Sequence, residues 1–507
     1  MNVKQRSIRL RYAGLVNFAG NITSVLFALF FMTMVSRKLP EEHFGLWHYL
    51  IILTQYFIMP ANLTNYWLIR YTGRGYKIAK TGIILNTLLM TISLIIFILL
   101  TPITIFPQIN LSNATLIVIA LIIRMITDYY QLTLMATASG AKPQAIGYGQ
   151  IIFEATRLPI AYLLIMKMNL GLLGVIIVMA IAKAIYTIFL TLLLKDEFTE
   201  KFNKQLAIKW IKLYWLPILG LISAQLLNFD VILMTFTYSS LPVAHMKAIQ
   251  TIIAVMLYTT QLYQPLYPIL LSGGSSKDIE IALSYFLLFA IPMMAGISAM
   301  SKTFLSLLKA PYAASANALT IATIYAFTLA LSRLFAGVLL GVEKVEIKNT
   351  VSMKEYVKSK LFYVPAMNII IYTIYLIVLY LTSKLIMINA NEPASIVLTW
   401  ITIKTIFITI LMIQFYRKCR EEIEFKIPLN KAFKYTLSST IMLITLLYLG
   451  VGQKVTTSFM EALKLSIIGT SIGATIYLTI LLVIEPEVKE LIKMAISEAK
   501  TMLMSIL

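Results

Sequence analysis

The segment Val35–Trp47, with the sequence VSRKLPEEHFGLW, lies between two long apolar runs and forms a short charged turn. Its Leu-Pro-x-x-His pattern, which starts at Leu39, recurs far downstream in the stretch SSLPVAHMKA, where it starts at Leu241. Pro and Gly are common in turns, so one such match is weak. The recurrence nevertheless suggests that the chain contains two related halves.

A second pair of turns supports this duplication at nearly the same offset. One apolar run ends in MATASGAKP, with Gly140, and a later one ends in FAGVLLGVEK, with Gly341. Each turn ends the fourth apolar run of its half. We therefore predict two units that keep the same orientation, as parallel repeats do in membrane transporters.

The composition of the chain identifies a polytopic membrane protein. The 507 residues are 59% hydrophobic and only 13% charged, whereas soluble domains are roughly 45–50% apolar and about 25% charged. Apolar runs of about 20 residues recur along the whole length, and each can cross a ~30 Å hydrocarbon core. These runs exclude a soluble core, and they lack the alternation of a membrane β-barrel.

Run lengths and helix breakers predict about fourteen transmembrane helices joined by short connections. The expected spans are 14–36, 46–66, 81–104, 113–135, 144–167, 170–194, 211–237, 242–271, 279–302, 313–341, 361–385, 394–416, 432–450 and 462–484. With six spans per repeat, the expected domains are an N-lobe over 1–200, a C-lobe over 201–416, and a third part over 417–507. The fold class is thus all-α, with two six-helix lobes in a parallel pseudo-twofold repeat, two extra helices and an amphipathic C-terminal tail.

The net charge of +21 is better explained by topology than by nucleic acid. With the N-terminus inside and an even number of spans, most Lys and Arg residues of the loops lie on the inner side, as the positive-inside rule requires. We therefore predict a multi-pass plasma-membrane protein with both termini cytoplasmic. We expect no nucleic-acid partner.

Few residues are suited to catalysis or metal binding. The single cysteine, Cys419, excludes an intramolecular disulfide and a thiolate cluster, and the three histidines are scattered. Neither a zinc-protease motif nor a Gly-rich phosphate loop is present. We predict a protein that is not an enzyme and has no cofactor, metal or catalytic residue.

Charged residues inside the expected spans require an explanation, because each costs at least ~2.5–3.5 kcal/mol at mid-membrane unless it is paired or hydrated. Arg124 and Asp128 share one face of the fourth span, and Glu154 and Arg157 share one face of the fifth. This intramembrane charge cluster is interpreted as an interhelical ion-pair group that stabilises the first lobe. The alternative is a gate or a proton-linked site.

Other intramembrane cations have no obvious partner in the sequence: Lys183, Lys247, Arg333 and Lys404. A net cationic interior suits an anionic polyprenyl (pyro)phosphate headgroup, which Lys and Arg would hold by charge-assisted hydrogen bonds. Drugs that are cations would instead favour a carboxylate-rich interior. The alternative for Arg333 is that it extends to lipid phosphates at the inner surface.

Polar stripes mark the second and eighth expected spans. Gln55 and Asn62 share one face of the second span, and Lys247, Gln250 and Gln261 share one face of the eighth. Helices that face only lipid do not carry such stripes. They either line a cavity or form amide hydrogen bonds between packed helices.

Short patterns along most of the chain resemble the polysaccharide-biosynthesis (oligosaccharide flippase) branch of the multidrug/oligosaccharidyl-lipid/polysaccharide (MOP) exporter superfamily. The patterns are VSRKLPEEHFGLWHYLIIL, MNLGLLGVIIVMAIAK (168–183), LLNFDVILM (226–234) and LSRLFAGVLLGVEKVE (331–346). One departure is that Leu39 is followed directly by Pro40, without the family's glycine.

The resemblance implies a two-lobe transporter that works by alternating access, with helices one, two, seven and eight around a central cavity. Combined with the polar stripes and the intramembrane cations, it predicts a set of residues that line a substrate cavity. These are Asn21, Gln55, Asn62, Asp230, Lys247, Gln250, Gln261 and Arg333.

The predicted function is a flippase that moves lipid-linked oligosaccharide from the inner to the outer leaflet around a cationic cavity. The alternatives are a multidrug or small-molecule exporter on the same scaffold and, with less support, a membrane glycan-transfer enzyme. The expected partners are a polyprenyl-linked oligosaccharide and membrane lipids, with glycan-assembly proteins as further candidates, and the protein is expected to be a monomer. Basic amphipathic pieces, among them 201–213, are expected at the inner membrane surface.

Overall fold

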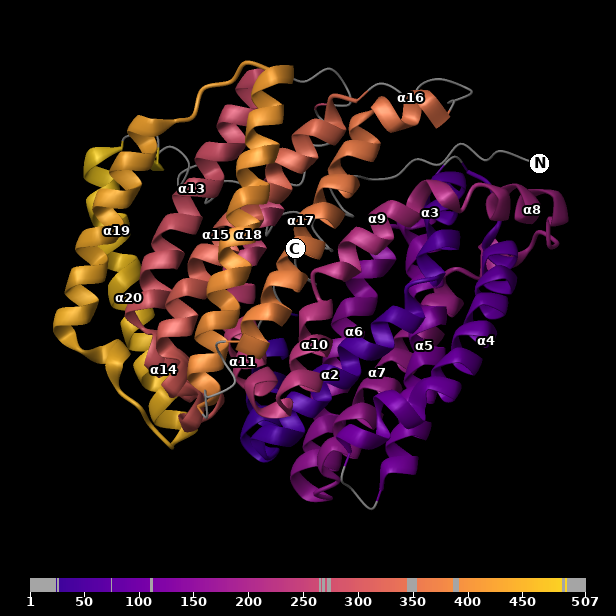
Figure 1. Ribbon diagram of the computed structural model, residues 1–507, viewed down its shortest axis with the longest axis horizontal. Helices are drawn as coiled ribbons and strands as arrows, with labels where there is room; N and C mark the ends of the chain where they lie inside the picture. The colour runs from indigo at the N-terminus through magenta and orange to yellow at the C-terminus, as the bar shows by residue number, and fades with distance from the viewer. Residues whose placement is uncertain are drawn as a thin grey trace, which may run out of the picture. The chain divides into compact units, whose positions relative to one another are not determined.

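The computed structural model is built from helices (Figure 1), and no strand occurs in the residues that it describes. The described residues are 24, 27–73, 75–109, 113–263, 266, 270, 275–343, 353–385, 392–485 and 488–489. The chain divides into two compact units, Met1–Lys247 and Ala248–Leu507, here called unit 1 and unit 2. The division along the chain falls within helix α11 (Ser240–Leu257). The expected lobe boundary at residue 200 and the six-helix repeat stay predictions.

Unit 1 begins with a helix over residues 27–38, which is followed by Pro40 at the N-cap of α2. Its further helices are α2 (Glu41–Ile58), α3 (Ala61–Gly73), α4 (Ala79–Thr104), α5 (Ala114–Ala141), α6 (Gln144–Ala161), η2 (Tyr162–Lys167), α7 (Gly171–Leu193), α8 (Lys204–Lys212), α9 (Trp215–Leu226) and α10 (Phe229–Thr237). The short helices η1 (Phe106–Gln108) and η3 (Lys195–Phe198) lie in connections.

Unit 2 continues from α11 into η4 (Tyr258–Tyr263). Its further helices are α13 (Ser276–Ala299), α14 (Ser301–Leu308), η5 (Ala310–Ser315), α15 (Ala316–Gly341), α16 (Met353–Lys358), α17 (Lys360–Leu385), α18 (Pro393–Glu422), α19 (Leu429–Leu449), η8 (Val451–Gln453) and α20 (Phe459–Ile484). The α19–α20 hairpin packs on α13 and α14, so the two predicted extra helices belong to this unit.

Within the described residues, twelve helical segments are long and apolar enough to cross a membrane. They correspond one to one with the third to fourteenth predicted spans. The first predicted span lies partly outside the described residues. The second is divided between α2 and α3, because the helix stops at Met59 and Pro60. The prediction of a multi-pass all-α membrane protein is confirmed, and fourteen stays an approximate count.

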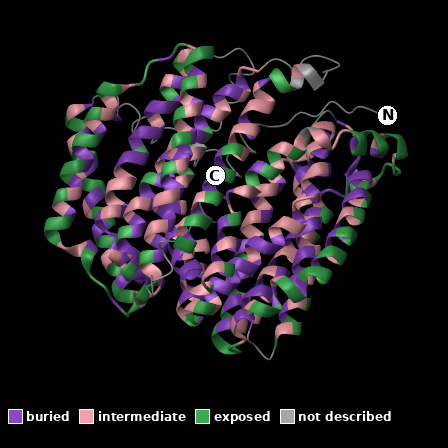
Figure 2. Cartoon of the chain, viewed as in Figure 1, coloured by how far each residue is buried: buried purple, intermediate pink, exposed green. Residues whose placement is uncertain are grey.

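Many helices expose large apolar side chains and also bury polar ones, which is unusual for a soluble helix. On α4, Leu88, Ile95 and Leu99 are exposed, whereas Asn86 and Ser93 are buried. Figure 2 shows exposed residues along much of α4 and, in unit 2, along α19 and α20. Lipid solvates the exposed faces, and hydrogen bonds hold the buried polar ones together.

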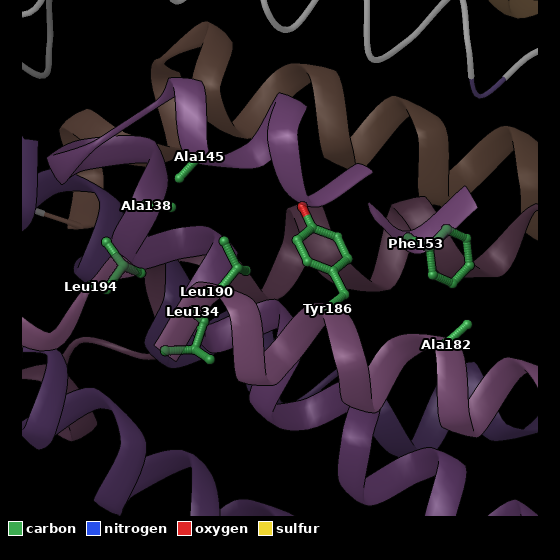
Figure 3. Close-up of a cluster of buried hydrophobic side chains, with 8 residues drawn as sticks. All are labelled: Leu134, Ala138, Ala145, Phe153, Ala182, Tyr186, Leu190 and Leu194. Atoms are coloured by element: carbon green, nitrogen blue, oxygen red, sulfur yellow. The ribbon is translucent and has the colours of Figure 1, made fainter. Parts of the chain in front are cut away.

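The core of unit 1 lies where α7 packs against both α5 and α6, which contact each other far less. Figure 3 shows the Tyr186 ring of α7 among buried apolar side chains of the three helices, with its hydroxyl turned toward α6. The Tyr186 hydroxyl donates to the backbone oxygen of Ile146 over 3.1 Å. A side chain at Gly149 would overlap the Tyr186 ring, so glycine permits this close approach.

Candidate functional site

Buried charges join α5 and α7 at Asp128. Arg124 lies one turn before Asp128 on α5, with its Nη2 atom 3.3 Å from Asp128 Oδ2. Lys183 of α7 forms an ion pair with the other carboxylate oxygen, Oδ1. Arg124 also donates from Nη1 to the hydroxyl of Thr54 on α2 over 3.0 Å. One carboxylate therefore pairs with cations from two helices, and its arginine reaches a third helix.

A second ion pair lies on α6. The Nη2 atom of Arg157 is 2.5 Å from Glu154 Oε2, and the Gln150 amide donates to Glu154 Oε1 over 3.5 Å. The Arg157 guanidinium lies over the rings of Phe31 and Phe153, 4.5 and 5.0 Å from their centroids. These ring contacts stabilise a cation in a site with little water.

Lys183 lies within electrostatic reach of both pairs, because it is attracted by Asp128 and repelled by Arg124 and Arg157. We call Arg124, Asp128, Glu154, Arg157 and Lys183 the charge cluster. The charges of this cluster do not cancel, because it holds three cations and two carboxylates. The four residues predicted from the sequence hold two cations and two carboxylates, whose charges cancel.

The expectation that Lys183 has no obvious partner is wrong, since it pairs with Asp128. The prediction of ion pairs between the fourth and fifth helices also needs correction. Both pairs form within one helix, and α7 supplies the link between helices. The position of Lys183 in the middle of an apolar span marks it as an intramembrane cation, but spacing along the chain does not show that α7 brings it to Asp128.

Three expected spans with polar residues are interrupted. The second span breaks between α2 and α3 at Met59–Pro60, because proline cannot donate the next backbone hydrogen bond. The seventh breaks between α9 and α10 at Leu227–Asn228, and the eighth changes from α11 into the 3₁₀ helix η4. In transporters, interrupted helices place backbone and polar groups at substrate sites.

Three amides of the polar stripes are half-buried: Gln55 on α2, Asn62 on α3 and Gln250 on α11. Among the described residues, none of the three makes a side-chain hydrogen bond to another residue. The neighbouring Asn65 behaves differently, because it is buried and accepts a 2.9 Å bond from Asn86 of α4. Asn65 therefore fits the helix-packing interpretation, and the three stripe amides do not.

Asp230 is fully buried in the first turn of α10, immediately after the break in the seventh span. A carboxylate is favoured there by the exposed N–H groups of the helix start. Tyr56 of α2 lies within electrostatic reach of Asp230, and its hydroxyl donates to the backbone oxygen of Gln225 over 2.7 Å. Asp230 therefore lies where α2 meets the break of the seventh span.

Arg333 and Lys404 have different surroundings in unit 2. Arg333 on α15 is exposed and lies within electrostatic reach of Tyr263 and Tyr372. Lys404 on α18 is buried, with its Nζ atom 5.5 Å from the centroid of the Tyr325 ring. Of the two, Arg333 is accessible to a ligand, whereas Lys404 belongs to the α15–α18 packing.

The two turns with the Leu-Pro-x-x-His pattern contact each other within unit 1. Glu41 Oε2 of the first turn lies 3.6 Å from His245 Nε2 of the second. A side chain at Gly45 would overlap the backbone carbonyl of Ser240 at the start of α11. The repeated turns therefore form a close helix-end contact, and Gly45 of the first turn is needed for it.

Two of the predicted cavity residues are not placed, since Asn21 lies outside the described residues and the Gln261 side chain is not described. Gln55, Asn62, Asp230 and Lys247 belong to unit 1, whereas Gln250 and Arg333 belong to unit 2. Lys247 is half-buried at the end of unit 1. In the described ranges, no group of three or more His, Cys, Asp or Glu side chains is arranged to hold a metal ion.

The helical content, the twelve candidate spans and the interrupted helices define a polytopic all-α membrane fold. No protein-family model and no curated protein sequence matches the chain. Similar solved structures include "Lipid II flippase MurJ, inward closed conformation", with a TM-score of 0.62 and 16% identity over 94% of this chain and 99% of that one.

Another is the inward-facing conformation of a multidrug resistance MATE family transporter of the MOP superfamily. Its TM-score is 0.55, with 11% identity over 78% of this chain and 95% of that one. The chain therefore has the MOP transporter fold, and the resemblance seen in its motifs is confirmed at the level of fold. Both of these structural neighbours are transporters and not enzymes.

Proposed function

We propose that this protein is a flippase that moves a lipid-linked oligosaccharide from the inner to the outer leaflet by alternating access. The observation that carries the proposal is the set of half-buried amides without side-chain partners on interrupted helices: Gln55, Asn62 and Gln250. The fold shared with a lipid II flippase adds support. We further propose a plasma-membrane location with both termini in the cytoplasm.

The chemistry of these side chains suits the two parts of such a substrate. Amide groups donate and accept hydrogen bonds, which matches sugar hydroxyls. Arg333 offers planar, paired donors to a phosphate, and Lys247 adds a second cation. In this mechanism the amides orient the glycan while the cations hold the (pyro)phosphate during the conformational change.

The test is a reconstituted flipping assay with a fluorescent polyprenyl pyrophosphate-linked saccharide in vesicles. Charge-assisted hydrogen bonds are worth about 1.5–3 kcal/mol, so Arg333→Ala and Lys247→Ala should each slow flipping at least about tenfold. In cells, both variants should abolish surface glycan at unchanged expression. Gln55→Leu with Asn62→Leu should weaken binding of the glycan but not of a sugar-free polyprenyl phosphate.

The matched control is Lys464→Ala, which removes an exposed lysine of α20 far along the chain from the proposed residues. This control should flip lipid at the wild-type rate. Wild-type flipping by both Arg333→Ala and Lys247→Ala would rule out a role for these cations in holding the headgroup.

A multidrug exporter is the second candidate, and the fold shared with a MATE family transporter favours it. In that function, the buried carboxylate of Asp230 would act on a cationic drug. Cells that overproduce the protein would then resist cationic drugs, and Asp230→Asn would remove that resistance. If the protein is a flippase, neither the wild-type protein nor the Asp230→Asn variant should change drug resistance.

A further inference from the structure

Helix α8 lies between the candidate spans Gly171–Leu193 and Pro217–Thr237, in the connection after α7. It lies at one end of unit 1, near α3 (Figure 1). It has the sequence KQLAIKWIK, and residues 201–214 contain no acidic side chain. Asn203 caps its start by accepting a 2.9 Å bond from the backbone N–H of Leu206.

One face of α8 is anchored on unit 1. Ala207 and Trp210 are buried in a cluster with Trp67 and Leu68 of α3, and the Trp210 ring packs edge-on against Tyr71 at 5.6 Å between centroids. The backbone N–H of Asn203 donates to Thr81 of α4, and just after the helix Tyr214 bonds Thr64 of α3. These contacts fix which face of α8 points outward.

The outward face combines cations with large apolar side chains. Lys204, Lys209 and Lys212 are exposed. Ile208 and Ile211 beside them are 44% and 49% exposed. Exposed lysines next to exposed isoleucines on a helix that directly connects membrane spans are typical of a helix in the membrane interface. Lys80, the residue before Thr81, is also exposed and extends the cationic surface.

We propose that α8 with Lys80 is a binding surface for the headgroups of anionic phospholipids. The lysines contact the phosphates while Ile208 and Ile211 enter the boundary between headgroups and acyl chains. Charge complementarity favours this occupant, because anionic leaflets attract clustered lysines next to membrane spans. The proposal is independent of the transported substrate.

The experiment places a fluorescent label on α8 of the full-length protein through Gln205→Cys. Gln205 is exposed and uncharged, and the native Cys419 is buried, so the introduced thiol is the one that reacts. The protein is reconstituted in neutral phosphatidylcholine vesicles and in vesicles with 30% phosphatidylglycerol. The readout is the quenching of the label by aqueous iodide.

We expect the label to be better protected from iodide in the anionic vesicles, and high salt to remove the difference. Each lysine should contribute about fivefold to headgroup affinity, so Lys204→Gln/Lys209→Gln/Lys212→Gln should abolish the protection. The control Lys454→Gln/Lys464→Gln removes exposed lysines of unit 2 and should keep it.

Equal protection of the wild-type label in both vesicle types would overturn the proposal, as would full protection in the triple variant. Protection by inorganic phosphate in detergent without lipid would also overturn it, because the site would then bind a free anion. Thermal unfolding of each variant in detergent establishes that the substitutions leave the anchoring of Trp210 intact.

Discussion

At the scale of single residues, the buried charges of unit 1 are explained by their partners. Asp128 accepts from Lys183 and pairs with Arg124, and this arrangement offsets the large desolvation penalty of the three ions. Because the charge cluster holds one more cation than carboxylate, its two acids are more critical than any one of its bases. Losing either acid leaves buried cations without compensation.

We therefore predict that Asp128→Ala destabilises the protein by about 3–5 kcal/mol, the usual effect of breaking a buried ion pair. Lys183→Met should be milder, since Arg124 and Asp128 still compensate each other. Thermal unfolding of the purified protein, followed by size-exclusion chromatography, measures both effects.

The control for this prediction is Asp196→Ala, which breaks an exposed pair with Lys142 at 3.5 Å. An exposed pair contributes at most about 1 kcal/mol, so this variant should unfold close to the wild-type temperature. If Asp128→Ala is as stable as Asp196→Ala, then the charge cluster does not stabilise unit 1, and a gate or proton-linked role becomes the better explanation.

At the scale of helices, breaks and close contacts distinguish the elements that carry the proposed site. The second, seventh and eighth spans carry the unpaired amides and Asp230, and each is interrupted, whereas α4 is continuous and faces lipid. The α2 start is held against the α11 start by a glycine contact. Interrupted helices with a tight contact at one end are suited to a hinged motion.

We predict that Gly45→Ala destabilises the protein by about 1–3 kcal/mol, because the added methyl group overlaps the Ser240 carbonyl and forces the helix ends apart. The matched control is Gly220→Ala on α9, where nothing lies within 4 Å of the added atom. That change should stabilise the helix by up to about 1 kcal/mol. The unfolding temperatures of the two variants should shift in opposite directions. Equal shifts would show that the close approach of Gly45 to Ser240 does not contribute to stability.

At the scale of the whole molecule, the distribution of lysine and arginine predicts the topology. The exposed Lys residues of α8 are expected inside, and the connection after α19 is expected outside. An even number of spans then places both chain ends on one side. A missed or false span would reverse the predicted membrane side of every later connection.

We predict that Gln453→Cys reacts with a membrane-impermeant maleimide in intact cells, whereas Gln205→Cys reacts only after permeabilisation. Both glutamines are exposed. The native Cys419 is buried, so the wild-type protein serves as the unlabelled control. Labelling of Gln205→Cys in intact cells would reverse the predicted orientation. Labelling of both in intact cells would indicate an even number of spans between them.

The resemblance of the chain's motifs implied the MOP transporter fold, and the sequence by itself was sufficient to predict the membrane class and the position of twelve spans. These features depend on local properties: a hydrocarbon core sets the length of each apolar run, and prolines, glycines and charges mark its ends. Even the interrupted seventh span was recognisable as one apolar run containing Asn228 and Asp230. Such signals need no knowledge of which helices are neighbours.

Only the tertiary structure showed which side chains meet. The pairing of Lys183 with Asp128 depends on α7 packing against α5, and the contact of Gly45 with Ser240 depends on two distant turns coming together. The same holds for the stripe amides, since a helical face shows only that Asn62 and Asn65 are polar. Packing decided that Asn65 bonds Asn86 while Asn62 stays available, because partners between helices are set by three-dimensional proximity and not by spacing along the chain.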